Sequence, residues 1–222
     1  GVDRTLALFR NLGLNGLDRP AEHYGLSLIL GGGESSLWEL CGAYATLGRI
    51  RYAHGRAAWN ERSVVHQPIL FANAPMELGE ATVPLSAGPV YLTLDALTQS
   101  QRPAGEQGWQ RFAGARNIAW KTGTSFGHRD AWAIGMSDTY CVGVWCGNAD
   151  GEGRPGLTGS LAAAPLLFDV FGLLPTGEVP EVPFDDLVQL PTCRKSGHRS
   201  SGICPATDTT WVPRSGARTE PC

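Results

Sequence analysis

The chain has 222 residues with 18 basic and 21 acidic side chains, giving a formal net charge of −3. Its length suits one good-sized domain, or one domain with a small appendage. The near balance of charge gives no reason to expect nucleic acid as a partner. Its 29 glycines and 15 prolines favour many short elements joined by loops over a helical bundle.

The ends of the sequence suggest a piece of a longer protein. The chain begins at Gly1 without an initiator methionine, and no signal peptide opens it. No apolar run approaches the roughly 18 residues that a membrane-spanning helix needs. We therefore expect any anchor or export signal to lie upstream of this chain.

Three helices are predicted in the first half. Apolar periodicity predicts helices over 2–14, 36–47 and 86–97, the last with a proline in its first turn. Ser36 and Glu39 have the spacing of a capping box at the start of the second helix. The glycines at 31–33 lack the lysine and spacing of a phosphate-binding loop and predict a turn. Residues 52–85 read as irregular, with one short strand over 64–71.

The second half changes to strand patterns. Runs at 117–124, 131–137 and 140–147 are separated by tight polar turns and predict an antiparallel meander. The last run is apolar on both faces, which predicts a central strand. A buried helix, bent or restarted at Pro165, is expected over 160–174.

Three segments follow from these patterns. We expect a main domain over 1–174, an acidic, proline-rich linker over 175–191, and the start of a further module over 192–222. The fold class expected for the main domain is α/β, an antiparallel sheet flanked by helices.

The six cysteines fall into two groups. Those at 41, 141 and 146 lie in apolar segments and are interpreted as buried small hydrophobes. Cys193, Cys204 and Cys222 lie in the polar tail, where a disulfide is plausible in an oxidising compartment. Their spacing does not match a zinc site, so no metal and no cofactor is predicted.

The segment most informative for chemistry is Lys121-Thr122-Gly123-Thr124. On an exposed strand edge, Thr122 and Thr124 would present two hydroxyls on one side, beside the charge of Lys121. Gly123 would let another backbone lie close. These groups predict a socket for an extended peptide that ends in a carboxylate, with the Thr124 amide free to donate to a developing oxyanion.

Four stretches of the chain resemble, in order and spacing, the transpeptidase domain of bifunctional class A penicillin-binding proteins of the 1C type. They are residues 26–47, 121–135, 142–151 and 159–168. The resemblance runs over residues 1–174 and implies the penicillin-binding transpeptidase and serine β-lactamase fold. Lys121-Thr122-Gly123 matches the third of the family's catalytic motifs. The chain contains neither Ser-x-x-Lys nor Ser-x-Asn, so we expect those two motifs, and the amino-terminal half of the domain, to lie upstream.

The resemblance implies a peptidoglycan DD-transpeptidase. The missing serine would attack the D-alanyl-D-alanine end of a stem peptide, and β-lactams would acylate the same serine. Lys121 would stabilise the charge network, Thr122 and Thr124 would hold the substrate carboxylate, and the Thr124 N–H would complete the oxyanion hole. The implied partners are the stem peptide, β-lactams and the missing half. The implied location is the periplasmic side of the bacterial inner membrane, and whether a glycosyltransferase domain precedes the chain stays open.

The residues alone leave three alternative functions to consider. One is a non-catalytic paralogue that holds cell-wall peptide or a partner protein. Another is a serine β-lactamase, against which the tail after residue 175 argues, because those enzymes end with the last helix. A hydrolase relay of Ser125, His128 and Asp130 is disfavoured, because the three sit within one short turn.

Overall fold

The computed structural model describes residues 1–54, 83–103, 116–218 and 220–222, with Pro68 and Leu70. The strand predicted over 64–71 lies mostly outside the described residues. The helices and strands are α1 (Val2–Asn11), α2 (Ala21–Tyr24), α3 (Leu37–Ala53), α5 (Ala87–Thr98), β1 (Ala119–Thr124), β2 (Asp130–Met136), β3 (Cys141–Gly147), α6 (Ala164–Leu173), β4 (Leu187–Cys193) and β5 (Thr207–Pro213). Short helical turns are η1 (Gly25–Leu30), η4 (Phe126–His128), η5 (Gly159–Ala163), η6 (Phe184–Asp186) and η7 (Arg214–Gly216). None of the described helices could span a membrane.

The predicted meander is confirmed. The strands form an antiparallel sheet in the order β1-β2-β3, with Thr124 opposite Ala131 at one end and Met136 opposite Cys141 at the other. In the part of the chain that the structure describes, β3 is an outer strand, so its predicted central position would require a further strand from the missing amino-terminal half. The strand is apolar on both faces because helices pack above and below it. This pattern does not indicate whether the edges of the strand are paired.

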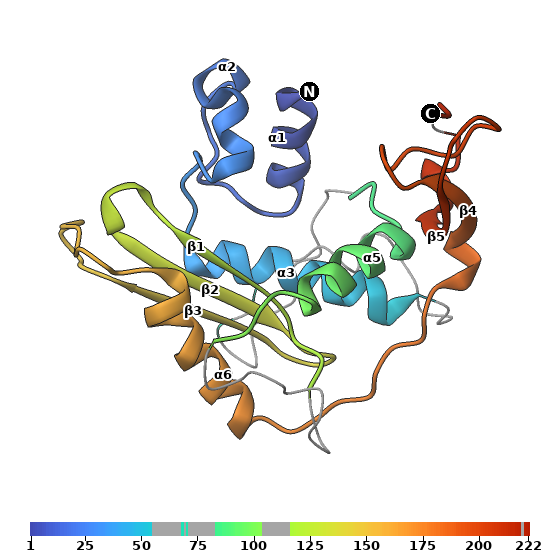
Figure 1. The fold of residues 1–222 in the computed structure, drawn as a ribbon. Coiled ribbons are helices and arrows are strands. Elements are labelled where there is room, and N and C mark those ends of the chain that lie inside the picture. Colours follow the sequence, from blue (N-terminus) through green and yellow to red (C-terminus); the bar gives the residue numbers. More distant parts are fainter. Residues whose placement is uncertain (55–67, 69, 71–82, 104–115, 219) are drawn as a thin grey trace.

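Helices cover both faces of this sheet, as predicted (Figure 1). One face packs on α3 and α5, through a cluster that includes Ile50, Leu94 and Met136. The other face packs on α6, through a cluster that includes Trp120 and Phe171. Side chains of a strand alternate between these two layers. At Gly143 a side chain would collide with the Cys41 sulfur, so α3 lies against the strand backbone there.

The capping box at the start of α3 is confirmed. Ser36 accepts from the Glu39 N–H, and the Glu39 carboxylate accepts from the Ser36 N–H. The helix continues to Ala53, well past its predicted end at Leu47. Burial of Ile50 against α5 and the sheet stabilises this added turn, a tertiary effect that local periodicity does not contain.

The restart at Pro165 is also confirmed, because η5 is a π-helical turn and α6 follows with the proline in its first turn. The prediction that this helix is buried holds for one face only. Leu167 and Phe171 are buried, whereas Leu161 and Leu173 are 74% and 87% exposed. The helix lies on the outside of the sheet, so several of its apolar side chains face outward in the described part of the chain.

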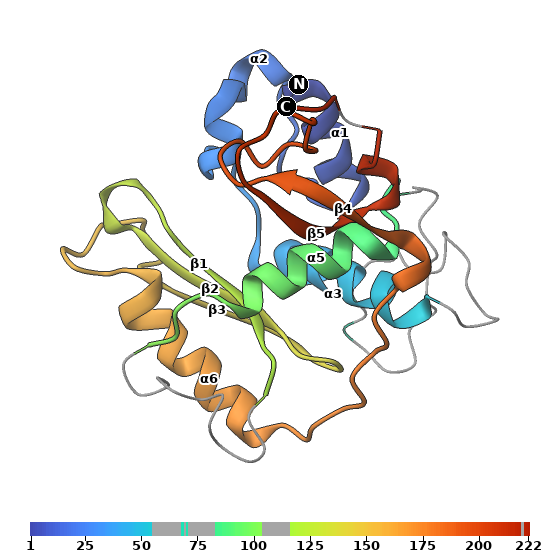
Figure 2. The same cartoon turned by 45° about the vertical axis from the view of Figure 1, so that its right-hand side comes forward.

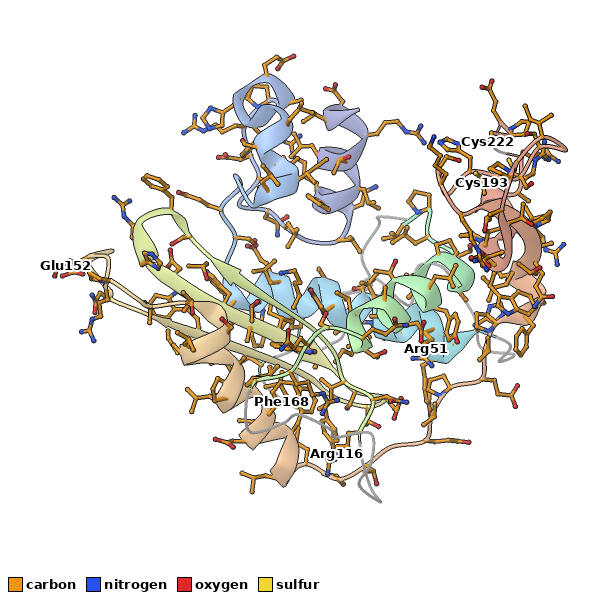
Figure 3. All side chains as sticks on the ribbon, in the orientation of Figure 1. Arg51, Arg116, Glu152, Phe168, Cys193 and Cys222 are labelled. Atoms are coloured by element: carbon orange, nitrogen blue, oxygen red, sulfur yellow. The ribbon has the colours of Figure 1, made fainter. Side chains whose placement is uncertain are left out.

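Two arginines hold α6 against the segment that precedes β1, and Figure 3 labels one of them, Arg116, together with Phe168 of α6. Arg116 donates to the carbonyls of Phe171 and Leu174 at the carboxy-terminal end of the helix, where a basic side chain can bond the last carbonyl groups. Arg102 lies over the ring of Phe168, 4.9 Å from its centroid, and donates to the Arg116 carbonyl at 2.6 Å. The segment just before β1 and the end of α6 are therefore held together.

The tail forms a second, small sheet in which β4 and β5 pair antiparallel. It lies beside α5 (Figure 2). The strand β4 begins at Leu187, inside the expected linker. Two acidic residues of that segment make contacts to the main body: Asp186 accepts from the Gly88 N–H of α5 at 2.6 Å, and Asp185 pairs with His54 at 2.8 Å. The segment is therefore attached to the body rather than a free spacer.

Candidate functional site

The four residues Lys121–Thr124 occupy the second half of β1, at an outer edge of the sheet. Thr122 and Thr124 share one face of the strand, next to η5, and Lys121 and Gly123 share the other. Lys121 and Thr124 are exposed, and Thr122 is half-buried. The expected pair of hydroxyls on one side of an exposed strand is present.

The backbone of β1 presents Thr122 and Thr124 to the open edge. The Ser125 N–H donates to the Asp130 carbonyl across the turn to β2 at 3.0 Å. Because residues of an antiparallel ladder alternate, Gly123 and Lys121 then also pair with β2, and the N–H and C=O groups of Thr122 and Thr124 point the other way. Among the described residues, no strand pairs with them there. This edge can accept an added strand.

Lys121 reaches the same edge from the opposite face. Its Nζ donates to the Thr122 carbonyl at 2.7 Å. The ammonium therefore lies at the strand backbone, bonded to the Thr122 carbonyl. A ligand carbonyl or carboxylate at the edge would compete with the Thr122 carbonyl for this charge.

Gly159 positions the Thr124 side chain, a role that the sequence did not single out. Its N–H donates to Thr124 Oγ1 at 3.0 Å, so the hydroxyl keeps its own hydrogen for a ligand. A side chain at Gly159 would collide with the Trp132 carbonyl and lie 2.6 Å from the Gly123 carbonyl. Only glycine allows η5 to approach the strands this closely. The signal in the sequence that could have indicated this role is the Gly159-Ser160 pair, which begins the stretch 159–168 that resembles the family.

The turn after β1 does not form a hydrolase relay. The Ser125 hydroxyl accepts from the Asp130 N–H at 2.8 Å, the His128 ring bonds the Leu157 carbonyl at 3.0 Å, and the Asp130 carboxylate accepts from the Trp145 indole at 2.9 Å. Each of the three side chains has a different partner. Trp145 is 38% exposed, whereas Trp120 is buried.

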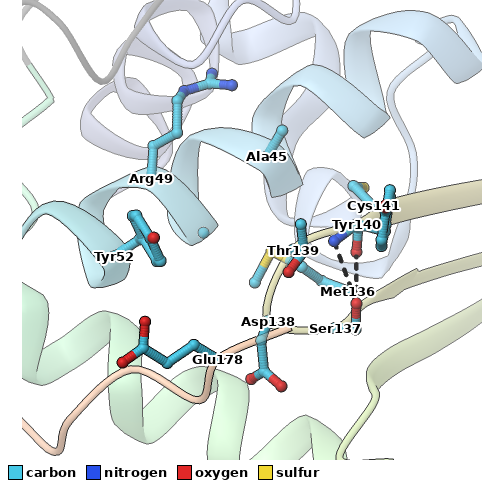
Figure 4. A pocket seen from close by; sticks show the side chains of 11 residues that line it. Ala45, Arg49, Tyr52, Met136, Ser137, Asp138, Thr139, Tyr140, Cys141 and Glu178 are labelled. Carbon is cyan, nitrogen blue, oxygen red and sulfur yellow. Dashed lines mark hydrogen bonds between the residues drawn. The ribbon is translucent and has the colours of Figure 1, made fainter. Parts of the chain in front are cut away.

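A cavity of about 400 Å³ lies at the other end of the sheet (Figure 4). Side chains of α3, including Arg49 and Tyr52, form one wall, and the β2–β3 turn with Glu178 forms another. Burial raises the pKa of Asp138 in that turn. By the strand register, this cavity and Thr124 lie at opposite ends of β2, so it is separate from the Lys121–Thr124 edge.

The cysteines of the body are less buried than expected. Cys41, Cys141 and Cys146 are all half-buried. Cys141 lies over α3 with its Sγ 3.6 Å from the Cys41 carbonyl. A separate hydrogen bond between the two cysteine side chains lowers the pKa of the Cys41 thiol and raises the pKa of the Cys141 thiol, which burial raises further.

The tail cysteines differ from the expectation drawn from their spacing. Cys193, Cys204 and Cys222 are brought together by the fold, with their sulfur atoms all within 4.8 Å of one another. In the described part of the chain, this is the one group of three or more His, Cys, Asp or Glu side chains close enough to hold a metal ion. It lies in the second sheet and not at the β1 edge.

Comparison with known proteins identifies the family. No family model matches the chain. The chain is 32% identical to penicillin-binding protein 1C of Escherichia coli over 218 residues, which are 96% of this chain and 26% of that protein. It is 29% identical to penicillin-binding protein 1A of Mycobacterium tuberculosis over 143 residues, covering 61% of this chain and 17% of that protein. It thus spans about a quarter or less of the curated relatives it matches.

A crystal structure of penicillin-binding protein 1A from Haemophilus influenzae matches the whole chain with a TM-score of 0.62 at 16% identity, over 38% of that structure. At this identity the match shows the fold alone, and it confirms the expected antiparallel sheet flanked by helices. The chain belongs to the penicillin-binding proteins and corresponds to part of the transpeptidase region of a class A member.

Proposed function

We propose that this chain supplies the substrate-binding strand of a serine-type peptidoglycan DD-transpeptidase, and that the nucleophilic serine is provided by a part of the protein upstream of Gly1. Residues 1–174 would form the carboxy-terminal part of the transpeptidase domain, 175–191 would connect it to the tail, and 192–222 would belong to a further module. The protein would act on the periplasmic side of the inner membrane, anchored by a segment outside this chain.

One observation supports this proposal most. The open edge of β1 combines two outward-facing backbone groups, those of Thr122 and Thr124, with the Thr124 hydroxyl and the Lys121 ammonium. An extended peptide can pair with such an edge through its backbone and place its terminal carboxylate on the hydroxyls and the ammonium. The D-alanyl-D-alanine end of a stem peptide has these features, and a β-lactam imitates them.

The edge also supports the acyl-transfer step. The Thr124 N–H points to the open edge, where it can donate to the carbonyl oxygen as negative charge develops on it. Gly159 holds the Thr124 side chain from the other side without occupying that N–H. The chain itself contains no Ser-x-x-Lys. It would therefore orient the substrate and stabilise the developing oxyanion, while the upstream serine forms the acyl bond.

The test is the rate of acylation by a fluorescent penicillin in the longer protein that includes the upstream half. Lys121→Ala should lower this rate about a hundredfold, the loss typical of one preorganised contact to the reacting group. Its effect on the melting temperature should be small, because Lys121 is exposed. Lys195→Ala is the matched control, an exposed lysine in the tail whose loss should leave acylation unchanged.

A melting temperature lowered by Lys121→Ala with normal acylation would instead assign this lysine a structural role. The chain by itself should form no covalent adduct, because it lacks the nucleophile. A labelled band that survives denaturing electrophoresis would contradict this expectation. A longer protein that binds stem peptide without ever being acylated would indicate a non-catalytic binding role.

A further inference from the structure

The three tail cysteines come from separate turns that backbone hydrogen bonds hold together. Cys193 ends β4, and its carbonyl accepts from Gly197 N–H at 2.8 Å in a tight turn. Its own N–H donates to the His198 carbonyl at 2.8 Å. Cys222 donates its N–H to the Arg199 carbonyl at 2.8 Å, which brings the end of the chain beside that turn. Figure 3 shows Cys193 and Cys222 next to each other at the far end of the second sheet.

Little else holds this part of the chain together. From 187 to 222, the buried residues among those described are Leu187 and Cys193. Leu187 packs toward α5, so Cys193 is the buried side chain at the opposite end of β4. A module of this size without an apolar core commonly depends on a disulfide or a structural metal. At this end the buried side chain is Cys193, and the sulfurs of Cys204 and Cys222 lie beside it.

Hydrogen-bond donors surround the sulfurs. The Ser196 hydroxyl and the backbone N–H groups of Ser196 and Lys195 are placed to donate to the Cys193 sulfur. The Ser201 hydroxyl lies 3.5 Å from the Cys204 sulfur. These donors orient the sulfurs in the way that groups around a metal site orient its ligands.

We propose that Cys193, Cys204 and Cys222 bind one Zn²⁺ ion as three thiolates, with a fourth position open to solvent beside exposed Cys222. Three thiolates at about 2.3 Å from a tetrahedral zinc lie about 3.8 Å apart. The sulfurs here already lie within 4.8 Å of one another, so small side-chain rotations complete the site. Each thiol that becomes a ligand releases its proton to the buffer.

A disulfide is the competing outcome in an oxidising compartment. It would join two of the sulfurs at about 2.0 Å and leave the third beside them unused. Convergence of all three sulfurs, with donors placed on more than one of them, favours a shared ion over a single covalent pair.

The experiment is a Co²⁺ titration of the full chain, reduced and kept under anaerobic conditions. Cobalt replaces zinc in thiolate sites and reports them by a thiolate-to-cobalt charge-transfer band and by the visible bands of tetrahedral geometry. We expect these bands to saturate at one equivalent and to disappear when Zn²⁺ is added. Elemental analysis of the zinc-loaded chain should then give one zinc per chain.

Variants separate this site from adventitious binding. Cys193→Ser and Cys204→Ser should each weaken cobalt binding at least tenfold, whereas Cys146→Ser, in a half-buried thiol of the body, should bind like the parent chain. Because a tail variant could fail to fold, the parent chain supplies a second measurement: zinc should raise its thermal midpoint, and a chelator should reverse the rise.

Three results would overturn the proposal. One is the absence of cobalt bands in the fully reduced parent chain. Another is binding that Cys193→Ser and Cys204→Ser leave unchanged. The third is a disulfide between two tail cysteines that forms in zinc-loaded protein exposed to air, as peptide mass mapping would show.

Discussion

The two sheets of this chain are stabilised in opposite ways. The sheet β1-β2-β3 lies between helical layers, and buried apolar clusters hold it on both faces. The sheet β4-β5 has two buried residues, one at each end of β4, and its other side chains are half-buried or exposed. The first gains its stability from apolar burial. The second relies on backbone pairing, contacts to the body and, as proposed above, a shared ion.

This difference matters for function. The β1 edge, which we propose binds a peptide, has to keep its shape without a partner strand, and the layered body behind it supports that shape. A small module with no apolar core can be added to such a body with little effect on its packing. The difference between the two sheets can be tested by sedimentation of the chain and by the stability of single-residue variants.

The largest effect should be self-association through the body. The outer edge of β3 has no partner strand among the described residues, and both faces of the strand are covered. Open edges of this kind recruit further strands. We expect the chain alone to self-associate in analytical ultracentrifugation and the longer protein, with the upstream half, to sediment as a discrete species. A clean monomer with cooperative unfolding would show that the chain closes its own sheet.

The next effect is loss of core packing. Phe171 is 1% exposed and lies in the cluster between α6 and the sheet. Phe171→Ala should lower the free energy of unfolding by about 3–5 kcal/mol, measured by urea denaturation. Leu173→Ala, two residues further and exposed, is the control and should change it by less than about 0.5 kcal/mol. Equal effects of the two variants would mean that α6 does not pack as described.

Asp186 tests how firmly the tail is joined to the body. Its carboxylate accepts from the Gly88 N–H near the start of α5, where the Ser86 side chain makes no capping bond. Asp186→Ala should cost about 0.5–2 kcal/mol of stability, as the loss of a helix cap does. Asp185→Ala removes an exposed pair with His54 and should have a smaller effect. If both variants unfold like the parent chain, the tail does not support α5.

The smallest effect concerns the acid side of the stability curve. Although burial opposes it, hydrogen bonds from the Ser36 N–H, from the Ser35 and Ser36 hydroxyls and from the Asn15 N–H lower the pKa of Glu39 below its ordinary 4.5. A folded-state pKa below the unfolded value stabilises the protein at pH values above 4.5, and this stabilisation is lost as the pH falls through the folded value.

Glu39→Gln should therefore reduce stability at pH 7 and flatten its fall on acidification, measured by thermal unfolding at several pH values. The exposed Glu34→Gln provides the control. A parent chain and a Glu39→Gln variant with parallel pH profiles would contradict this assignment.

Much of the body could be predicted from the sequence because its signals are local. Short polar turns separate the strand runs at 117–124, 131–137 and 140–147, so their antiparallel pairing follows from the local sequence. The spacing of Ser36 and Glu39 likewise marks the start of a helix. The alternation of Thr122 and Thr124 on one side of a strand is likewise set by backbone geometry. The resemblance to penicillin-binding proteins also rests on residues in linear order.

Tertiary structure alone decided the rest, because the relevant distances join residues far apart in the chain. The extension of α3 to Ala53 depends on packing against α5, and the close approach of Gly159 to Thr124 depends on where η5 returns to the sheet. The meeting of Cys193, Cys204 and Cys222 has no regular spacing, since each arrives by its own turn. Sequence alone determined which residues could form strands, caps and ligands, and the folded backbone decided which of them meet.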